Sequence, residues 1–439
     1  MRNPTHRKRG ILDAGLRNAT LAVVAGILLI ALAGLESQPA QAQQFSVIHT
    51  FIPTDGWYPD AGLTIDQAGN LYGTTNLGGN MGGNCGSGCG TVFKMSKRGS
   101  GWIFDELYKF NADDGGFNPE ARVVFGPNGT LYGTAVSGGS GAAGVVFNLQ
   151  PPATVCKSVS CPWTETVIFP FQASGVLDPG GDLTFDAAGN IYGTTFYGGN
   201  YGDCEEEGCG TIYQLTQSNG VWSQNIVHVF TGETDGQHPA GGVILDRAGN
   251  LYGSVEGDPN LGDSGLVFRF IPSGGTWTET ILYRFQGYAQ GEFPVAGLFF
   301  DPSGSLVGAT LQGGFYGGGT VYQLSPTGSS WIFDTLHNFD IAGADYPFGP
   351  LGKLVMDSAG NLYGATGTDG AYGYGAVFQL RPSDHGWIYR SLYDFTGGTD
   401  GSFPRNVVMD ASGNLYGITT YGGNDACQAG CGVVFEITP

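Results

Sequence analysis

The chain has 439 residues, of which 78 are glycine, 13% are charged and 13% are aromatic. Glycine without a three-residue period excludes a collagen-like helix, and a chain of this length and apolar content can bury a sizeable core. The formal net charge of −20 argues against binding to nucleic acid or anionic membranes, because both require clustered Lys and Arg. Few charges with many Gly, Tyr, Phe, Thr and Val residues predict an all-β protein with tight turns.

The first predicted element is a secretory signal peptide at residues 1–42. A basic stretch from Met1 to Thr20 precedes an uncharged apolar run from Leu21 to Leu35, and Pro39–Ala42 supplies the small residues of a cleavage site. The apolar run is shorter than the roughly 20 residues that span a bilayer. We therefore expect an exported protein, extracellular, on the cell surface or periplasmic, with no membrane insertion after cleavage. An uncleaved membrane anchor is the alternative.

Residues 43–439 are predicted to form one domain built from an internal repeat. The segment Asp66–Thr75 reads DQAGNLYGTT, and six related segments follow at intervals of 53 to 60 residues, beginning at Gly126, Asp186, Asp246, Asp301, Asp357 and Asp410. Spacing in this range is typical of a propeller, solenoid or other array.

Each repeat contains four strand-like pieces. In the first repeat these are Gly62–Ile65, the Leu-Tyr-Gly-Thr piece, Gly90–Met95 and Trp102–Phe110. Alternation and β-branched or aromatic residues support strands throughout. An Asp-x-x-Gly-Asn turn joins the first two pieces, where the Asp carboxylate can accept hydrogen bonds from its own turn and glycine supplies positive φ. An Asp-Gly-x-x-Pro turn follows the fourth piece in several repeats.

The two ends of the repeated region complement each other. Six fourth strands lie inside the repeats, a seventh (Phe45 to Phe51) stands alone before them, and the last repeat stops at Ile437 without a fourth strand. Pairing of the first strand with the last three would close a ring and remove open sheet edges. The sequence therefore predicts a seven-bladed β-propeller with four antiparallel strands per blade.

The repeated Asp-x-x-Gly-Asn-Leu-Tyr-Gly-Thr core, followed by Gly-x-Val-Phe-x-Leu and Leu-Tyr-x-Phe, resembles the GloVer tandem-repeat family of exported bacterial proteins. The resemblance covers nearly all of residues 43–439. It implies an exported β-propeller, often surface-associated, and it implies little about activity because fold does not fix function.

Eight cysteines form four close pairs, which we expect to be local disulfides of an exported protein. The pairs are Cys85 with Cys89, Cys156 with Cys161, Cys204 with Cys209, and Cys427 with Cys431. A metal site is the alternative, but the pairs lack the usual C-x2-C zinc spacing and no His lies beside them. We expect no cofactor and no metal.

Familiar catalytic motifs do not occur in the sequence: there is no G-x-S-x-G, H-E-x-x-H or P-loop. The repeated turn aspartates could bind calcium, but turn hydrogen bonding explains them better, and Glu205–Glu207 is interpreted as a solvated charge run rather than a weak calcium site. His49, His228 and His337 occupy equivalent fourth-strand positions and are interpreted as packing residues. His238 is different, because it lies in a turn on the predicted rim.

The loops between the second and third strands combine Gly, Asn, Asp and Tyr and should share a rim with the Asp-Gly-x-x-Pro turns around the channel mouth. Tyr offers an amphipathic contact surface, while Asn and Asp offer hydrogen bonds. The candidate ligand residues are Tyr197, Tyr201, Asp203, Asp235, His238, Tyr316, Asp369, Tyr372, Tyr374, Asp400 and Tyr421. The alternative is that these loops only make turns and cover sheet edges.

The leading functional hypothesis is therefore a monomeric, exported, non-catalytic scaffold that binds a glycan or a protein at this rim. The alternative is a propeller-type polysaccharide lyase or glycoside hydrolase, whose acid and base would come from Asp203, Asp235, His238, Asp369 and Asp400. A third possibility is a structural envelope spacer.

Overall fold

The computed structural model describes residues 43–82, 85–112, 115–152, 163–172, 176–199, 204, 207–232, 234–258, 262–340 and 348–438. The predicted signal peptide lies outside these residues, so it stays a prediction. Within the described ranges, no helix combines the length and apolarity needed to cross a bilayer.

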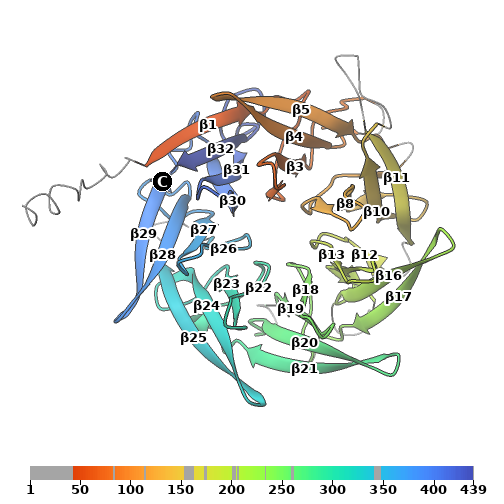
Figure 1. Cartoon of the computed structure of the whole chain (residues 1–439), viewed down its shortest axis with the longest axis vertical. Helices are drawn as coiled ribbons and strands as arrows, with labels where there is room; N and C mark the ends of the chain where they lie inside the picture. The colour runs from red at the N-terminus through yellow and green to blue at the C-terminus, as the bar shows by residue number, and fades with distance from the viewer. Residues whose placement is uncertain are drawn as a thin grey trace, which may run out of the picture. The chain divides into compact units, whose positions relative to one another are not determined.

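Residues 44–438 form seven four-stranded antiparallel sheets arranged in a ring around a central channel (Figure 1). The innermost strands are β2 (Leu63–Ile65), β7 (Val124–Phe125), β13 (Thr184–Phe185), β18 (Val243–Leu245), β22 (Phe299–Phe300), β26 (Val355–Met356) and β30 (Ser402–Met409). The second strands are β3 (Leu71–Thr75), β8 (Leu131–Ala135), β14 (Ile191–Thr195), β19 (Leu251–Val255), β23 (Leu306–Thr310), β27 (Leu362–Thr366) and β31 (Leu415–Tyr421).

The two outer strands of each sheet are longer. The third strands are β4 (Thr91–Arg98), β10 (Ala142–Gln150), β16 (Thr211–Ser218), β20 (Leu266–Ser273), β24 (Gly317–Thr327), β28 (Ala376–Ser383) and β32 (Val433–Thr438). The fourth strands are β5 (Gly101–Lys109), β11 (Thr164–Gln172), β17 (Val221–Val229), β21 (Thr276–Arg284), β25 (Ser330–Asp340), β29 (Gly386–Asp394) and β1 (Gln44–Thr50). In this order of strands we number the sheets blade 1 to blade 7.

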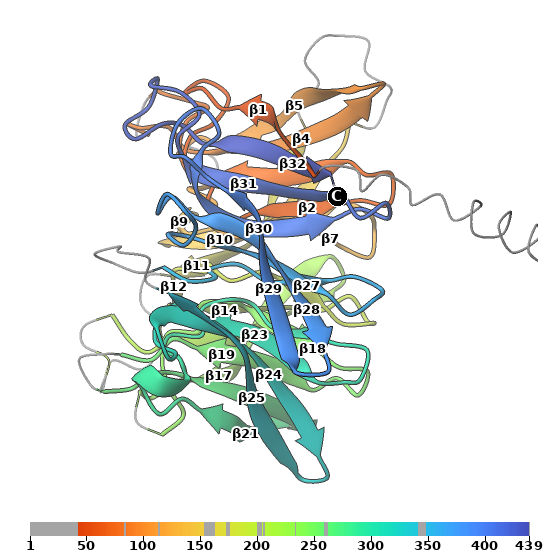
Figure 2. The ribbon, with the colours of Figure 1, turned by 90° about the vertical axis from the view of Figure 1, so that its left-hand side faces the viewer.

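Two short strand pairs and one 3-10 turn lie on one face of the ring. The pairs are β6 (Gly116–Phe117) with β9 (Ser137–Gly138), and β12 (Val176–Leu177) with β15 (Tyr197–Gly198); the 3-10 turn η2 spans Tyr288–Gln290. Figure 2 shows this face edge-on at the left, marked by β9 and β12. We call it the rim face, because it carries the second-to-third strand loops and the connections between blades.

Blade 7 closes the ring as predicted. β1 pairs with β32 from Gln44 opposite Thr438 to Thr50 opposite Val433, and the sheet order is β1-β32-β31-β30. The predicted seven-bladed propeller is therefore confirmed, including its closure by the N-terminal strand.

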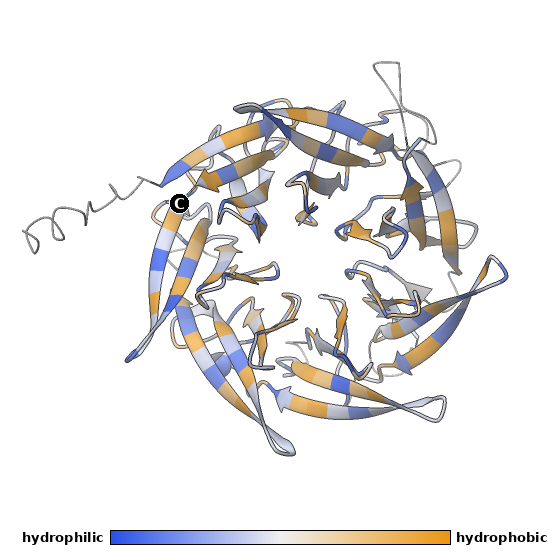
Figure 3. Cartoon of the chain, viewed as in Figure 1, coloured by the Kyte–Doolittle hydropathy of each residue, from blue (hydrophilic) through white to orange (hydrophobic). Residues whose placement is uncertain are grey.

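The blades pack through the same aromatic contact seven times. A buried phenylalanine just after or within the end of each fourth strand meets the ring of a third-strand aromatic in the next blade, with centroids 5.0 to 5.6 Å apart. The pairs are Phe51–Phe93, Phe110–Phe147, Phe171–Tyr213, Phe230–Phe268, Phe285–Tyr322, Phe339–Phe378 and Phe395–Phe435. Phe51, which directly follows the closing strand β1, meets Phe93 with the same geometry as the other pairs. Figure 3 shows the complementary pattern, hydrophobic and hydrophilic residues alternating along the outer strands.

The repeated Asp-x-x-Gly-Asn-Leu-Tyr-Gly-Thr motif is explained by packing and turn hydrogen bonds. In blade 1, Asp66 Oδ1 accepts hydrogen bonds from the backbone N of Ala68 (2.9 Å) and Asn70 (2.8 Å), and its Oδ2 accepts one from the Tyr72 hydroxyl (3.1 Å). Partial burial opposes ionisation of Asp66, but these hydrogen bonds outweigh it and hold its pKa below the ordinary value. Gly69 adopts the expected positive φ, 80°.

The glycine of Leu-Tyr-Gly-Thr makes room for the third-strand ring. A Cβ on Gly73 would lie 2.5 Å from Cζ of Phe93, and a Cβ on Gly253 would lie 2.5 Å from Cζ of Phe268. The following threonine bonds across the sheet, as Thr75 Oγ1 does with Thr91 Oγ1 at 2.9 Å. The motif that reveals the repeat is thus part of the scaffold.

Three of the four predicted disulfides are confirmed: Cys85–Cys89, Cys204–Cys209 and Cys427–Cys431, with Cα atoms 5.1 to 5.2 Å apart. All three lie in second-to-third strand loops on the rim face. Each closes a loop of only a few residues, so it constrains the rim locally rather than holding the ring together.

The fourth predicted disulfide, between Cys156 and Cys161, is not among the disulfides that the structure shows. Cys156 lies outside the described residues, and so does Cys161. The bond between Cys156 and Cys161 therefore stays a prediction from their spacing.

Candidate functional site on the rim face

The rim face carries a repeated strained residue just before its proline. In six blades this residue is not glycine yet has a left-handed φ of 58 to 63°: Tyr58, Asn118, Asp178, His238, Phe293 and Phe403. At Asn118, His238 and Phe293, two backbone hydrogen bonds hold this conformation. In His238, for example, N donates to Cys209 O (2.9 Å) and O accepts from Glu256 N (3.0 Å). These six blades therefore carry different side chains at the same position before the rim proline.

Aromatic side chains gather around a pocket between blades 6 and 7, which we call the rim pocket. Its volume is about 430 Å³, and Tyr374, Phe403 and Tyr421 line it together with small residues such as Gly373 and Ser402. Tyr374 is 49% exposed. The Tyr421 hydroxyl lies 3.0 Å from that of Tyr58, so the pocket has both ring faces and hydroxyl groups.

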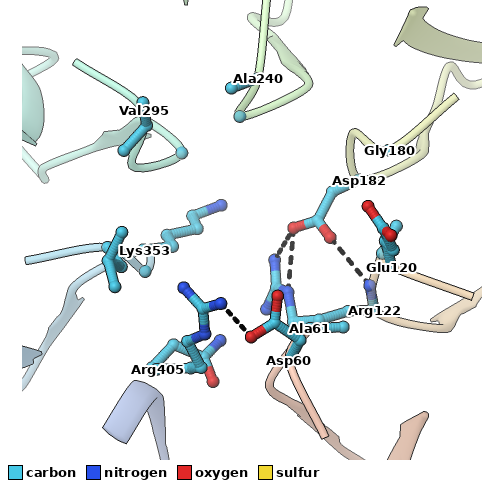
Figure 4. A pocket seen from close by; sticks show the side chains of 16 residues that line it. Asp60, Ala61, Glu120, Arg122, Gly180, Asp182, Ala240, Val295, Lys353 and Arg405 are labelled. Carbon is cyan, nitrogen blue, oxygen red and sulfur yellow. Dashed lines mark hydrogen bonds and ion pairs between the residues drawn. The ribbon is translucent and has the colours of Figure 1, made fainter. Parts of the chain in front are cut away.

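A second cavity, of about 140 Å³, lies at the central channel, and we call it the channel cavity (Figure 4). All seven blades contribute to it through the first residues after the rim proline, which in blade 7 already belong to the innermost strand β30. Its charged lining residues are Asp60, Glu120, Arg122, Asp182, Lys353 and Arg405. Glycine and alanine make up most of the uncharged lining. Neighbouring backbones meet closely here, since a Cβ on Gly241 would lie 3.0 Å from Gly297 Cα.

Two ion pairs bridge neighbouring blades in the channel cavity. Arg122 Nη2 pairs with Asp182 Oδ2, and Arg405 Nη2 pairs with Asp60 Oδ1. Arg405 also lies over the ring of Phe403, 5.2 Å from its centroid, so it connects the channel cavity to the rim pocket. These pairs neutralise four of the six charged side chains that line the cavity.

The remaining two charged side chains, Glu120 and Lys353, form neither of these ion pairs. The amide of Asn76 donates to Glu120 Oε1 at 2.8 Å. Lys353 is partly buried and has no hydrogen-bond or ion-pair partner among the described residues, and its amine points into the cavity (Figure 4). Burial, reinforced by the positive charge of Arg122, lowers the pKa of Lys353 to about 8.

The structure brings some of the predicted ligand residues together. Tyr374 and Tyr421 line the rim pocket. Tyr197 and His238 meet with ring centroids 5.5 Å apart, and His238 stacks on Phe196 at 4.6 Å. Burial lowers the pKa of His238, against the pull of nearby Asp258 and Glu207. Tyr201 and Asp203 lie outside the described residues.

Other predicted residues stand apart on the rim. Tyr372 (62% exposed) is in the loop that carries Tyr374, whereas Tyr316 (53% exposed) is one blade away beside Phe315. Asp369 is partly buried and accepts a hydrogen bond from the Tyr389 hydroxyl at 3.2 Å. Burial and the neighbouring charges of Asp394 and Asp340 raise the pKa of Asp369.

Two predicted carboxylates bind their own turns. Asp235 accepts hydrogen bonds from the backbone N and hydroxyl of Thr231, and Asp400 does the same with Thr396. Each also contacts a fourth-strand side chain, His228 Nε2 for Asp235 (2.9 Å) and the Tyr393 hydroxyl for Asp400 (3.1 Å). Both carboxylates are almost fully buried. In this arrangement they fix the connection between blades.

One group of side chains has the composition of a metal site: His228, Asp235 and Glu279, with ligand atoms within 4.8 Å of one another. Asp235 is already bound by His228 and Thr231, and the equivalent contact in blade 6 uses a tyrosine. The group is therefore better explained as turn structure than as a cation site.

The charged residues of the channel cavity were not among the predicted site residues. A signal for them exists in the aligned repeats, since Pro59, Pro119, Pro179, Pro350 and Pro404 are each followed within three residues by a charge. Blades 4 and 5 have only Ala, Gly and Val there, at Ala240–Gly241 and Val295–Gly297. The charges differ between repeats in sign and in their distance from the rim proline. They therefore do not form a recognisable sequence motif.

These features define a seven-bladed β-propeller with a charged channel cavity and an aromatic pocket on one face. The model of the Gloeobacter/Verrucomicrobia repeat matches residues 36–204 and 158–355. The chain belongs to this repeat family, which confirms the resemblance noted from the sequence. No curated protein matches the chain.

Solved structures with similar folds are distant. A protein of unknown function from Dyadobacter fermentans is 11% identical, with 90% of this chain and 98% of that chain covered and a TM-score of 0.46. A gluconolactonase from Xanthomonas campestris is 13% identical, with 70% and 81% covered and a TM-score of 0.37. PorZ, a surface component of the type-IX secretion system of Porphyromonas gingivalis, is 14% identical, with 89% and 47% covered and a TM-score of 0.48. We draw no conclusion about activity from these similarities.

Proposed function

We propose that this protein is an exported, non-catalytic β-propeller that binds a glycan in the rim pocket. The observation that carries the proposal is the pocket itself, in which Tyr374, Phe403 and Tyr421 surround about 430 Å³. This volume lies within the roughly 300–1,000 Å³ of small-ligand sites. Tyrosine suits a sugar, because its ring packs against C–H groups while its hydroxyl exchanges hydrogen bonds with the sugar.

Export is part of the proposal. Its support is the signal-like sequence of residues 1–42 together with three disulfides, which persist in oxidising compartments.

The enzyme alternative, a polysaccharide lyase or glycoside hydrolase, needs an acid and a base free to act on the substrate. Asp235 and Asp400, two of the carboxylates expected for that role, accept hydrogen bonds from their own turns. We therefore favour binding over turnover.

A glycan array probed with the purified protein tests the proposal. We expect Tyr374→Ala to weaken binding to the best glycan by at least about tenfold, since loss of a buried aromatic contact costs about 1.4 kcal/mol or more. Tyr288→Ala removes a tyrosine that is 60% exposed in η2, between blades 4 and 5, and serves as the matched control.

Three results would contradict the proposal: no glycan bound by the native protein, equal binding by Tyr374→Ala, or cleavage of the bound glycan. Capture of a protein partner that depends on Tyr374, with a silent array, would favour the protein-binding reading instead.

A further inference from the structure

The six charged side chains that line the channel cavity are three cations and three anions, but only four of them pair with one another. Arg122 with Asp182 and Arg405 with Asp60 form two neutral pairs, and Glu120 is held by Asn76. Lys353 alone points into the cavity without a partner in the described part of the chain (Figure 4). The two side chains outside the ion pairs are therefore Lys353 and Glu120. Burial and the neighbouring charge of Asp178 raise the pKa of Glu120 to about 7, so near neutral pH its carboxyl only partly offsets the amine.

Keeping this lysine costs stability, because a partly buried ammonium loses water contacts that nothing in the described structure replaces. The fold itself does not require a side chain at this position. Gly62, Gly242 and Gly297 stand at the same place after the rim proline in blades 1, 4 and 5. The stem of Lys353 even lies against Gly297, where a Cβ would be 3.7 Å from Lys353 Cβ. Packing therefore does not explain the amine.

We infer that the channel cavity binds a small carboxylate, with Lys353 as its counter-charge. At about 140 Å³ the cavity is close to the engineered cavity of about 150 Å³ that holds benzene, so it takes in a carboxylate and part of one sugar ring. A single carboxylate completes a third ion pair beside the two already formed. The carboxyl group of Glu120 and the guanidinium groups of Arg122 and Arg405 are then available for hydroxyl groups on the ligand.

This inference does not depend on glycan binding in the rim pocket. The proposed carboxylate site is formed by the charged residues of the channel cavity, including Lys353, whereas the rim pocket is formed by Tyr374 and Tyr421. The two sites therefore have separate variants, and the failure of one leaves the other standing.

The test is calorimetric titration of the full chain with D-glucuronate, with D-glucose as the neutral probe and inorganic phosphate as the competing anion. We expect glucuronate to bind, glucose not to bind, and Lys353→Met to weaken glucuronate at least about tenfold. Lys109→Met replaces a surface lysine paired with Glu106 and should change nothing. Tyr374→Ala should also keep its affinity for glucuronate.

The pH dependence supplies a second readout. The groups that face the cavity are Asp60, Glu120, Arg122, Asp182, Lys353 and Arg405. Only the protonated amine pairs with a carboxylate, so affinity should fall about tenfold for each pH unit above the pKa of the amine in the free protein, about 8, until the pH reaches the higher pKa of the amine in the complex. Glu120, whose pKa is about 7, is ionised over this range, so the fall reports the amine. Lys353→Met should remove this fall.

Equal affinity of the native protein and Lys353→Met would overturn the inference, as would equal binding of glucose or of phosphate. So would an NMR titration in which acetate and glucuronate leave the Lys353 side-chain resonance unmoved. A glycan that ends in glucuronate should compete with free glucuronate if the natural carboxylate is part of a larger sugar. If that glycan does not compete with free glucuronate, the ligand of the channel cavity is a free acid.

Discussion

Two parts of each repeat behave in opposite ways. The hairpin from Asp66 to Thr75 makes the same Asp-centred contacts as its counterparts in blades 3, 4, 6 and 7. The segment from the rim proline to the innermost strand differs in every blade. The first part forms turns and interblade packing. The second lines the channel cavity with unlike charges. In this molecule the repeated residues build the fold, and the residues that differ between repeats line the cavity in which a ligand can bind.

The largest expected effect tests whether the closing blade is equivalent to the others. Phe51→Ala removes a ring that is fully buried against Phe93 at the closure. We expect a loss of about 3–5 kcal/mol in the free energy of unfolding, the usual cost of a large core truncation. Urea denaturation followed by tryptophan fluorescence measures it.

Phe230→Ala is the matched variant, because it truncates the same contact between blades 3 and 4. Similar losses would support a ring in which blade 7, assembled from both ends of the chain, is as stable as blade 3, which comes from one continuous segment. A loss in Phe51→Ala below about 1 kcal/mol would show that the ring opens at blade 7 before the rest unfolds.

A smaller effect is expected at the repeated turns. Asp246→Ala leaves the Tyr252 hydroxyl and the Asn250 amide without their acceptor, which lies 3.1 and 2.7 Å away in the native chain. We expect a loss of about 1–3 kcal/mol in unfolding free energy. Arg247→Ala, at the exposed neighbour in the same turn, should stay within about 0.5 kcal/mol of the native protein.

The difference in unfolding free energy between the native protein and Asp246→Ala should become smaller as the pH falls. Partial burial opposes ionisation of Asp246, but hydrogen bonds from Asn250, Tyr252 and Ala248 outweigh it and lower its pKa. Its contribution is therefore complete above the unfolded pKa, near 3.9, and is lost as the pH falls through the lower folded value. A gap between native and Asp246→Ala that grows in acid would contradict this assignment.

Much of the fold was predictable because it repeats. The unpaired strand Phe45–Phe51, the seven Asp-x-x-Gly-Asn turns or their variants and the cysteine pairs are all local patterns, and they led to the ring, the closure and the three observed disulfides. The rim pocket was predictable in part, since Tyr374 and Tyr421 were among the candidates. Their neighbour Phe403 was not, because its exposure depends on a left-handed backbone that sequence alone does not reveal.

The channel cavity was not predicted, for a related reason. Lys353 is an ordinary residue in a repeat that otherwise follows the pattern, and its partner-free position depends on seven blades meeting at one axis. Asp60 and Arg405 are 345 positions apart in the chain, and their pairing exists only because the ring closes. Contacts that depend on closure have no local signature.

The smallest expected effect concerns Lys353, in the segment after the rim proline. It tests whether this residue lowers the free energy of unfolding without being needed for the fold. Burial lowers the pKa of Lys353 to about 8, whereas an unfolded lysine titrates near 10.4. Below pH 8 both states are protonated and the penalty for the buried charge is constant. Between pH 8 and about 10.4 the folded state releases a proton that the unfolded state keeps, so native stability rises.

Lys353→Met should therefore be more stable than the native protein at pH 7, by about 1–2 kcal/mol, with the gap narrowing by pH 9.5. Urea denaturation at the two pH values measures the gap, with Lys109→Met as the surface control, for which no comparable narrowing is expected. A destabilised Lys353→Met would mean that the amine supports the fold after all. A stabilised one would mean that blade 6 retains a costly charge at a position where blades 1, 4 and 5 have glycine, which is how a residue kept for binding rather than for stability should behave.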